Sequence, residues 1–143
     1  MPHMPKPFTR ALALLSGIMV SPALAADLIR PLPSDRANLD DLRWQARPVL
    51  IFAPSGTDED FRRQMRLFDA VRAGLAERDI VVFADTAPKA GGLLRQRFGI
   101  EGFQVLLVGK DGGVKLSQSS PLAPDTLFAT IDAMPMRRQE MQE

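Results

Sequence analysis

The sequence contains no cysteine, no tyrosine and a single histidine, His3. Without cysteine the protein has no dithiol, no disulfide, no thiolate nucleophile, no lipoprotein anchor and no sulfur ligand for zinc. Histidine is the commonest general base and metal ligand, so acid–base and metal chemistry lack their usual side chain. Thiol–disulfide exchange requires a thiolate, and the composition therefore excludes it.

The charges are nearly balanced, with 18 Lys and Arg against 17 Asp and Glu. This balance gives no broad positive field, so we expect no binding to nucleic acid. Apolar residues make up 45% and charged residues 24% of the 143-residue chain, which is typical of a single globular domain.

Residues 1–25 have the pattern of a signal peptide. Lys6 and Arg10 precede the apolar stretch 11–20, and Ala23-Leu24-Ala25 supplies small residues at a cleavage site. The alternative is a membrane anchor, but a spanning helix needs about 20 apolar residues and this stretch is too short. We therefore expect export to the periplasm or the medium, loss of His3 on cleavage, and no stable membrane insertion afterwards.

The remaining chain predicts an N-terminal arm over residues 26–38 and one domain over residues 39–143. Apolar runs predict strands at residues 48–54, 79–84, 103–108 and 114–117. Helices are predicted from Ser55 or Thr57 to Leu75, over residues 93–98, and from Pro124 to Pro135, before a charged tail. Asp111-Gly112 predicts a hairpin turn between the last two strands.

This order, β-α-β-α-β-β-α, predicts an α/β fold: a thioredoxin-like three-layer sandwich with a mixed four-stranded sheet. Residues 98–107 resemble the thioredoxin segment that enters the hairpin. In that family a cis-proline stands where this sequence has Gln104, and Cys-x-x-Cys stands where it has Ser55-Gly56-Thr57-Asp58-Glu59. The resemblance implies the fold, and these departures imply that redox activity does not carry over.

A second resemblance covers nearly all of the chain after the signal peptide. The matching segments are Leu42-Arg43-Trp44, Arg47-Pro48, Phe52-Ala53-Pro54-Ser55, Glu77-Arg78-Asp79, residues 109–115, Leu127-Phe128, Ile131-Asp132 and residues 134–137. On these segments the sequence resembles the domain-of-unknown-function 4174 family, bacterial exported proteins with relatives inside animal extracellular-matrix proteins. The resemblance implies a thioredoxin-like fold but no established reaction.

Ser55 and Thr57 are candidate binding residues, because they precede a helix whose first amides could hold an anion. The alternative is helix capping by Thr57 with Asp60 three residues on. Capping is favoured, since the acids nearby would repel a phosphate.

Lys110, Asp111 and Lys115 could present two lysines and a carboxylate to a ligand. A solvated hairpin is the alternative; its geometry explains Asp111 but neither lysine. Arg137 and Arg138 are candidates for a partner contact or for stabilising a helix C-terminus.

Three weaker patterns favour structural roles. Trp44 offers a stacking surface, but packing at the sheet edge is favoured. Met134, Met136 and Met141 suggest a copper(I) site built from thioether ligands, but packing is again favoured. Asp85 ends the second strand, where α/β sheets often bind ligands, and alone it is a weak indication. We therefore expect neither metal nor cofactor.

Two functions remain open. The first is a non-catalytic thioredoxin-like module that binds a protein. The second is a hydrolase-like enzyme that uses Asp58, Glu59 and Lys110, which would require one pocket to bring these groups together.

Overall fold

The computed structural model describes residue 3 and residues 28–143. Except for His3, the predicted signal peptide lies outside the described residues. Within the described part of the chain, no helix has the length and apolarity that a membrane crossing requires.

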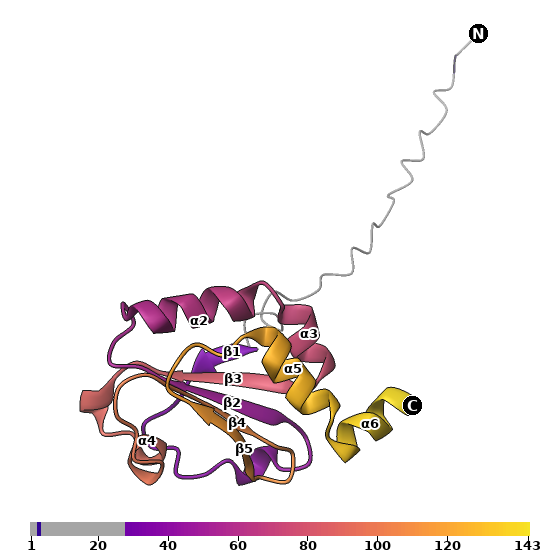
Figure 1. Cartoon of the computed structure of the whole chain (residues 1–143). Coiled ribbons are helices and arrows are strands. Elements are labelled where there is room, and N and C mark those ends of the chain that lie inside the picture. Colours follow the sequence, from indigo (N-terminus) through magenta and orange to yellow (C-terminus); the bar gives the residue numbers. More distant parts are fainter. Residues whose placement is uncertain (1–2, 4–27) are drawn as a thin grey trace.

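A five-stranded mixed sheet forms the centre of the fold (Figure 1). Its strands are β1 (Ile29–Pro31), β2 (Arg47–Phe52), β3 (Ile80–Asp85), β4 (Gln104–Val108) and β5 (Val114–Gln118), in the order β1-β3-β2-β4-β5. β3 runs parallel to β1 and β2, and β4 runs antiparallel to β2 and β5. The predicted fold class is confirmed.

The strand count is five and not the predicted four. The additional strand, β1, lies in the segment predicted as an N-terminal arm. β1 has only three residues and ends at Pro31, and proline is typical of turns and of strand ends. Its single neighbour β3 supplies the pairing, which Leu32 extends by donating its N–H to the Ala84 carbonyl at 2.8 Å.

Helices cover both faces of the sheet, giving three layers (Figure 1). One face packs against α2 (Glu59–Asp69), α3 (Arg72–Glu77) and α5 (Pro124–Asp132), with Phe68, Leu75, Leu127 and Ile131 buried. The other face packs against α4 (Leu93–Arg97) and the 3-10 helix η1 (Asp40–Leu42), with Leu94 buried. A second 3-10 helix, η2 (Pro88–Ala90), leads into α4.

The central strand β2 is buried along its whole length. Val49 and Ile51 belong to the core under α2 and α5, whereas Leu50 and Phe52 belong to the core under α4. Successive side chains of a strand point to opposite faces, so an uninterrupted apolar run is what a strand covered on both faces requires.

Two predicted helices differ from the observed ones. The helix expected to run to Leu75 ends at Asp69, with Ala70 as its C-cap. The helix α3 begins separately because Val71 has a non-helical backbone, with φ −127°. Residues after Pro135 form the helix α6 (Pro135–Gln142) and not a tail. Pro135 opens this helix, since proline at the first helical position has a suitable φ and loses no hydrogen bond.

Gln64 is fully buried on α2 and fixes the segment before α5. Its Nε2 donates to the Leu122 carbonyl at 3.0 Å, and its Oε1 accepts from the Leu122 N–H at 2.6 Å. One side chain thus satisfies both backbone groups of a buried loop residue, which would otherwise be left without partners.

Gln64→Leu should therefore lower the free energy of unfolding by about 2–4 kcal/mol, because a buried donor and a buried acceptor lose their partners. Urea unfolding followed by circular dichroism would measure the change. The matched control is Gln96→Leu, because Gln96 is exposed and makes one hydrogen bond, to the Gly91 carbonyl. Equal losses for the two variants would contradict the role assigned to Gln64.

Candidate functional site

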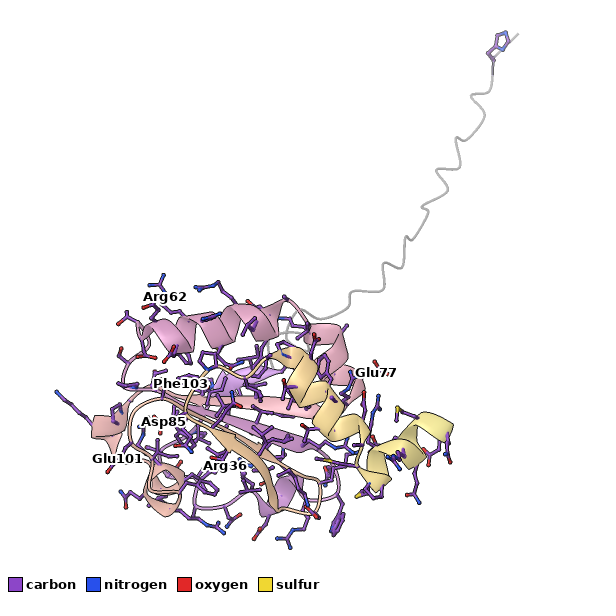
Figure 2. All side chains as sticks on the ribbon, viewed as in Figure 1. Arg36, Arg62, Glu77, Asp85, Glu101 and Phe103 are labelled. Atoms are coloured by element: carbon purple, nitrogen blue, oxygen red, sulfur yellow. The ribbon has the colours of Figure 1, made fainter. Side chains whose placement is uncertain are left out.

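The candidate residues lie at two opposite ends of the sheet. The carboxyl pole is the end where β2 and β3 finish, at Phe52 and Asp85, and the amino pole is the end where they start, at Arg47 and Ile80. Figure 2 shows Asp85 and Glu101 at the carboxyl pole and Glu77 toward the amino pole. Five residue steps of β2 place about 16 Å between the poles.

At the carboxyl pole, the hydroxyl groups of Ser55 and Thr57 are hydrogen-bonded to each other at 3.1 Å. Neither caps α2. The cap is Asp58, whose carboxylate accepts from the Phe61 N–H at 3.0 Å, and this corrects the expected cap at Ser55 or Thr57. A carboxylate at this place also interacts favourably with the helix dipole. These side chains serve the local structure of the loop.

A buried ion pair closes the same pole beneath the loop. The guanidinium of Arg95, from α4, donates through Nε to the Asp85 carboxylate at 3.0 Å. Its Nη2 also donates to the carbonyl oxygens of Ala53 and Asp85, at 3.0 and 2.9 Å. Asp85, the candidate ligand position at the end of β3, is thus held by Arg95 and by the Ala87 N–H.

Gln104 replaces the cis-proline of thioredoxins with an ordinary peptide, and no cis peptide bond occurs among the described residues. Its Nε2 donates to the Ser117 hydroxyl at 2.6 Å. A cavity of about 560 Å³ lies near this pole, lined by Pro54, Pro88, Gly91, Arg95, Gln96, Gly99, Ile100, Glu101 and Gly102. These lining residues include no hydroxyl and no thiol, and Glu101 supplies their one carboxylate.

The amino pole carries a network of four cationic and four acidic side chains, which we call the α6 network. Its members are Arg47, Glu77, Arg78, Asp79, Lys110, Asp132, Arg137 and Glu140. They come from the starts of β2 and β3, the end of α3, the β4–β5 hairpin, α5 and α6. The network therefore joins elements that are distant in sequence.

Glu140 is the acceptor on which half of the network converges. Arg47, 1% exposed, binds both of its carboxylate oxygens, at 3.1 and 3.2 Å. The ammonium group of Lys110 binds Glu140 at 2.6 Å and Asp79 at 2.8 Å. Charge-assisted hydrogen bonds of this kind are stronger than neutral ones, and bidentate pairing fixes the orientation of both side chains.

Asp132 is the acceptor for the other half. Arg78 binds it with two parallel hydrogen bonds, at 3.0 and 2.9 Å, while its guanidinium lies 4.0 Å from the centre of the Phe128 ring. Arg137 binds Asp132 at 3.1 Å and also reaches both the carboxylate and the backbone carbonyl of Glu77. Arg137 is only 4% exposed and its guanidinium is bound within the network, whereas Arg138 is exposed.

The opposite charges of the network shift several pKa values. Burial works to lower the pKa of Lys110, but hydrogen bonds to Asp79 and Glu140 outweigh it and raise that pKa. Burial works to raise the pKa of Glu140, but Arg47 and Lys110 together lower it. The hydrogen bond from Arg78 lowers the pKa of Asp132, with a further contribution from Arg137. All three groups are thus held in their charged forms.

The remaining predicted residues of the hairpin make a local pair. Lys115 binds the Asp111 carboxylate at 2.8 Å, and the Gly113 N–H binds the same side chain at 3.0 Å. The hydrogen bond from Lys115 is the main cause that lowers the pKa of Asp111. Gly112 has φ +87°, the positive value that the Asp-Gly turn predicts.

The structure does not assemble the hydrolase-like site. Asp58 and Glu59 lie at the carboxyl pole, whereas Lys110 lies at the amino pole, where it is paired with Asp79 and Glu140. Asp58 is also engaged as a helix cap. Since general acid–base catalysis needs groups within hydrogen-bond reach, these three residues do not form one catalytic site in this structure.

Trp44 stands exposed at the rim of a groove at the amino pole. The side chain is 61% exposed, so the expected packing at the sheet edge is wrong. Its backbone has φ +67°, a left-handed conformation that bulky residues rarely adopt, and its N–H donates to the Lys110 carbonyl at 2.7 Å. The residue is therefore fixed by its backbone while its ring faces solvent.

We call this feature the Trp44 groove. It has a volume of about 330 Å³ and is lined by Trp44, Arg47, Gly109, Lys110, Asp111, Lys115, Met134, Pro135 and Met136. Met134 packs partly against the core, whereas Met136 is exposed. Three of the predicted site residues, Lys110, Asp111 and Lys115, are brought together here. Ser55 and Thr57 lie at the other pole.

Sequence reasoning missed Arg47, Arg95 and Glu140. Each makes its decisive contact with a residue ten or more positions away, for example 93 positions between Arg47 and Glu140. The one available signal was the arginine at the start of an otherwise apolar strand. A cation in that place requires a buried acceptor.

Comparisons with known proteins identify a family and similar folds. A model of the family described as "Domain of unknown function (DUF4174)" matches residues 38–140. The structure of desulfothioredoxin from Desulfovibrio vulgaris Hildenborough is similar, with a TM-score of 0.55, 16% identity, and coverage of 76% of this chain and 99% of that chain. A 2-Cys peroxiredoxin of Plasmodium vivax gives a TM-score of 0.55, 13% identity and coverage of 71% and 84%.

A further similar structure is the mitochondrial 2-Cys peroxiredoxin of Plasmodium falciparum, with a TM-score of 0.54, 12% identity and coverage of 73% and 84%. These similarities show the fold. Seven of the eight α6-network residues, all but Glu140, fall within the segments that carry the family resemblance. The segments that contain these seven residues meet at the amino pole, whereas the segment Phe52-Ala53-Pro54-Ser55 lies at the carboxyl pole.

The α6 network predicts a pH profile of stability. Asp132 and Glu140 have lowered pKa values, so their contribution is present above their ordinary values of 3.8 and 4.5 and is lost as pH falls through the folded values. Lys110 has a raised pKa, so its contribution is present below 10.5 and is lost as pH rises through the folded value. The melting temperature, measured as a function of pH, should therefore be constant over a middle range and decrease at both low and high pH.

Glu140→Gln should lower the free energy of unfolding at neutral pH by about 2 kcal/mol, because Arg47 and Lys110 lose an ionised partner. The variant should also lose less stability than the original protein as pH falls. Glu101→Gln is the control, since Glu101 is exposed and forms no ion pair within residues 28–143. If the Glu140 variant lost as much stability at low pH as the original protein, the contribution assigned to Glu140 would be contradicted.

The backbone of Trp44 predicts an inverted order of stability for two substitutions. Trp44→Gly should be more stable than Trp44→Ala by about 1 kcal/mol, since alanine keeps the strain of positive φ and glycine releases it. At the exposed helical position Ala76, glycine should instead be less stable than alanine. Melting temperatures of the variants would measure both differences; the same order at both positions would contradict the assignment.

Proposed function

The chain belongs to the DUF4174 family, and on that premise we propose that it is an exported, non-catalytic module that binds another protein. The observation that carries the proposal is a thioredoxin-like fold in a chain that has no cysteine at all. The scaffold is retained while its usual reaction is chemically impossible, and this favours a role in binding.

The carboxyl pole supports a non-catalytic role. Ser55 and Thr57 bind each other, Asp58 caps α2, and Arg95 is bound by three oxygen atoms. A nucleophile needs a neighbouring base that is free to accept its proton, and these polar groups are already engaged in local structure.

Export is the second part of the proposal. It rests on Lys6 and Arg10, the apolar stretch 11–20, and Ala23-Leu24-Ala25. We propose cleavage before Ala26 and a location in the periplasm or the medium of a bacterium. The relation to domains of animal extracellular-matrix proteins belongs to the same proposal and would place binding modules of this kind outside cells in both groups.

Export is tested by producing the full chain in a Gram-negative bacterium and sequencing the amino terminus of the protein recovered from the periplasmic fraction. We expect Ala26 as the first residue. Replacing the apolar residues Leu14 and Leu15 by arginine should keep the protein in the cytoplasm with the signal segment still attached, because the interrupted apolar stretch no longer serves as a signal. A periplasmic protein that still carries residues 1–25 would contradict the cleavage.

Protein binding is tested by placing a photoreactive amino acid at single positions of the exported chain in living cells. Met136 probes the amino pole, Thr57 the carboxyl pole and Ser117 the strand β5; all three are exposed. We expect a discrete cross-linked band from at least one position. No band at any position, together with reproducible turnover of a substrate, would overturn the proposed function.

A further inference from the structure

The Trp44 groove displays apolar surface from two distant segments of the chain. Trp44 precedes β2, and Met134, Pro135 and Met136 link α5 to α6. Trp44 and Met136 are both exposed large apolar side chains. Tryptophan is enriched at the centres of protein interfaces, and methionine adapts its shape to different partners.

The same groove carries cationic N–H groups whose donors are not all used. Arg47 also lines the groove, but it is almost fully buried, and its Nε, which has no acceptor among the described residues, is not accessible to a ligand. Lys110 uses its ammonium group on Asp79 and Glu140, which leaves one of three N–H groups, and Lys115 binds Asp111 alone. Unused donors on cationic groups favour a ligand that supplies a carboxylate.

Among the lining residues alone, cations outnumber anions. Arg47, Lys110 and Lys115 contribute three positive charges, against one negative charge from Asp111. Asp79 and Glu140 balance Lys110 and Arg47 but are not among the lining residues. A groove of about 330 Å³ is at the lower end of the range for ligand sites, about 300–1,000 Å³, so it suits one or two side chains of a peptide.

We propose that the Trp44 groove binds a segment of a partner protein in which an acidic side chain stands next to a large apolar one. The apolar side chain packs between Trp44 and Met136, and the carboxylate faces Lys115 and Lys110. This inference rests on the proposed function, since it names the surface and the partner chemistry of the binding module.

Trp44 is the single tryptophan of the chain, so its fluorescence reports on the groove alone. The probe is the blocked peptide acetyl-Gly-Ser-Leu-Glu-Leu-Ser-Gly-amide, titrated into the protein purified after export. We expect a saturable shift of the emission to shorter wavelength. Peptides with glutamine for glutamate, or serine for both leucines, should bind about tenfold more weakly, because each lacks one of the two groups.

Two pairs of variants test the residues by calorimetry with the same peptide. Lys115→Gln should weaken binding about fivefold, whereas Lys89→Gln, an exposed lysine at the other pole, should leave it unchanged. Trp44→Gly should abolish measurable binding, whereas Leu93→Ser, at another exposed apolar residue, should not. Thermal unfolding of each variant verifies that it is folded.

Three outcomes would overturn the inference. One is equal affinity for the glutamate and glutamine peptides. Another is tight binding only of a glutamine peptide with a free terminal carboxylate, which would assign the groove to chain ends. The third is a Trp44 emission that depends on protein concentration, with a dimer in sedimentation, which would assign the groove to a second copy.

The cross-linking experiment separates this inference from the proposed function. A cross-link from Met136 that Lys115→Gln weakens supports both. A cross-link from Thr57 or Ser117 alone, with none from Met136, leaves the binding function in place and overturns the assignment of the groove.

Discussion

The contact between Arg47 and Glu140 is the interaction on which the arrangement of the amino pole depends. It places a guanidinium at the first position of the most deeply buried strand. An uncompensated charge there would be strongly destabilising, so Glu140 must be present before β2 can be fully enclosed. Because Glu140 also holds Lys110, the docking of α6 orders the β4–β5 hairpin, and Asp79 ties that hairpin to the start of β3.

The two poles use polar side chains in different ways. At the carboxyl pole, Arg95 and Asp85 satisfy each other and the backbone at the ends of β2 and β3, and this closes the region that a thioredoxin keeps reactive. At the amino pole, the α6 network forms the wall of an open groove, beside an exposed Trp44. At the carboxyl pole the exposed Glu101 lines a cavity, whereas the predicted site residues Lys110, Asp111 and Lys115 line the groove at the amino pole.

Much of the fold could be predicted from local patterns. The apolar runs marked β2, β3 and β4, the Asp-Gly pair marked the hairpin, and the order of elements gave the correct class. β1 was not predicted because its stability comes from pairing with β3, and three residues carry no periodicity. The cap at Asp58 was missed for a related reason, since Ser55, Thr57 and Asp58 are all good capping residues and only the backbone path selects among them.

The candidate site was predictable only in part, because its chemistry is made by distant segments. Lys110, Asp111 and Lys115 were found from the hairpin itself, and they line the groove. Arg137 carries the same composition signal as Arg138, yet it is buried while its neighbour is exposed. The difference comes from Asp132 and Glu77, which no pattern near α6 reveals. Trp44 was misplaced because burial is the common fate of tryptophan, and its positive φ is invisible in the sequence.

The separation of 93 positions between Arg47 and Glu140 has a consequence for a polypeptide that crosses a membrane amino end first. Arg47 emerges long before Glu140, and until then its guanidinium is best left in water. Under the proposed export, β2 would be fully enclosed only after α6, which carries Glu140, has followed it across the membrane.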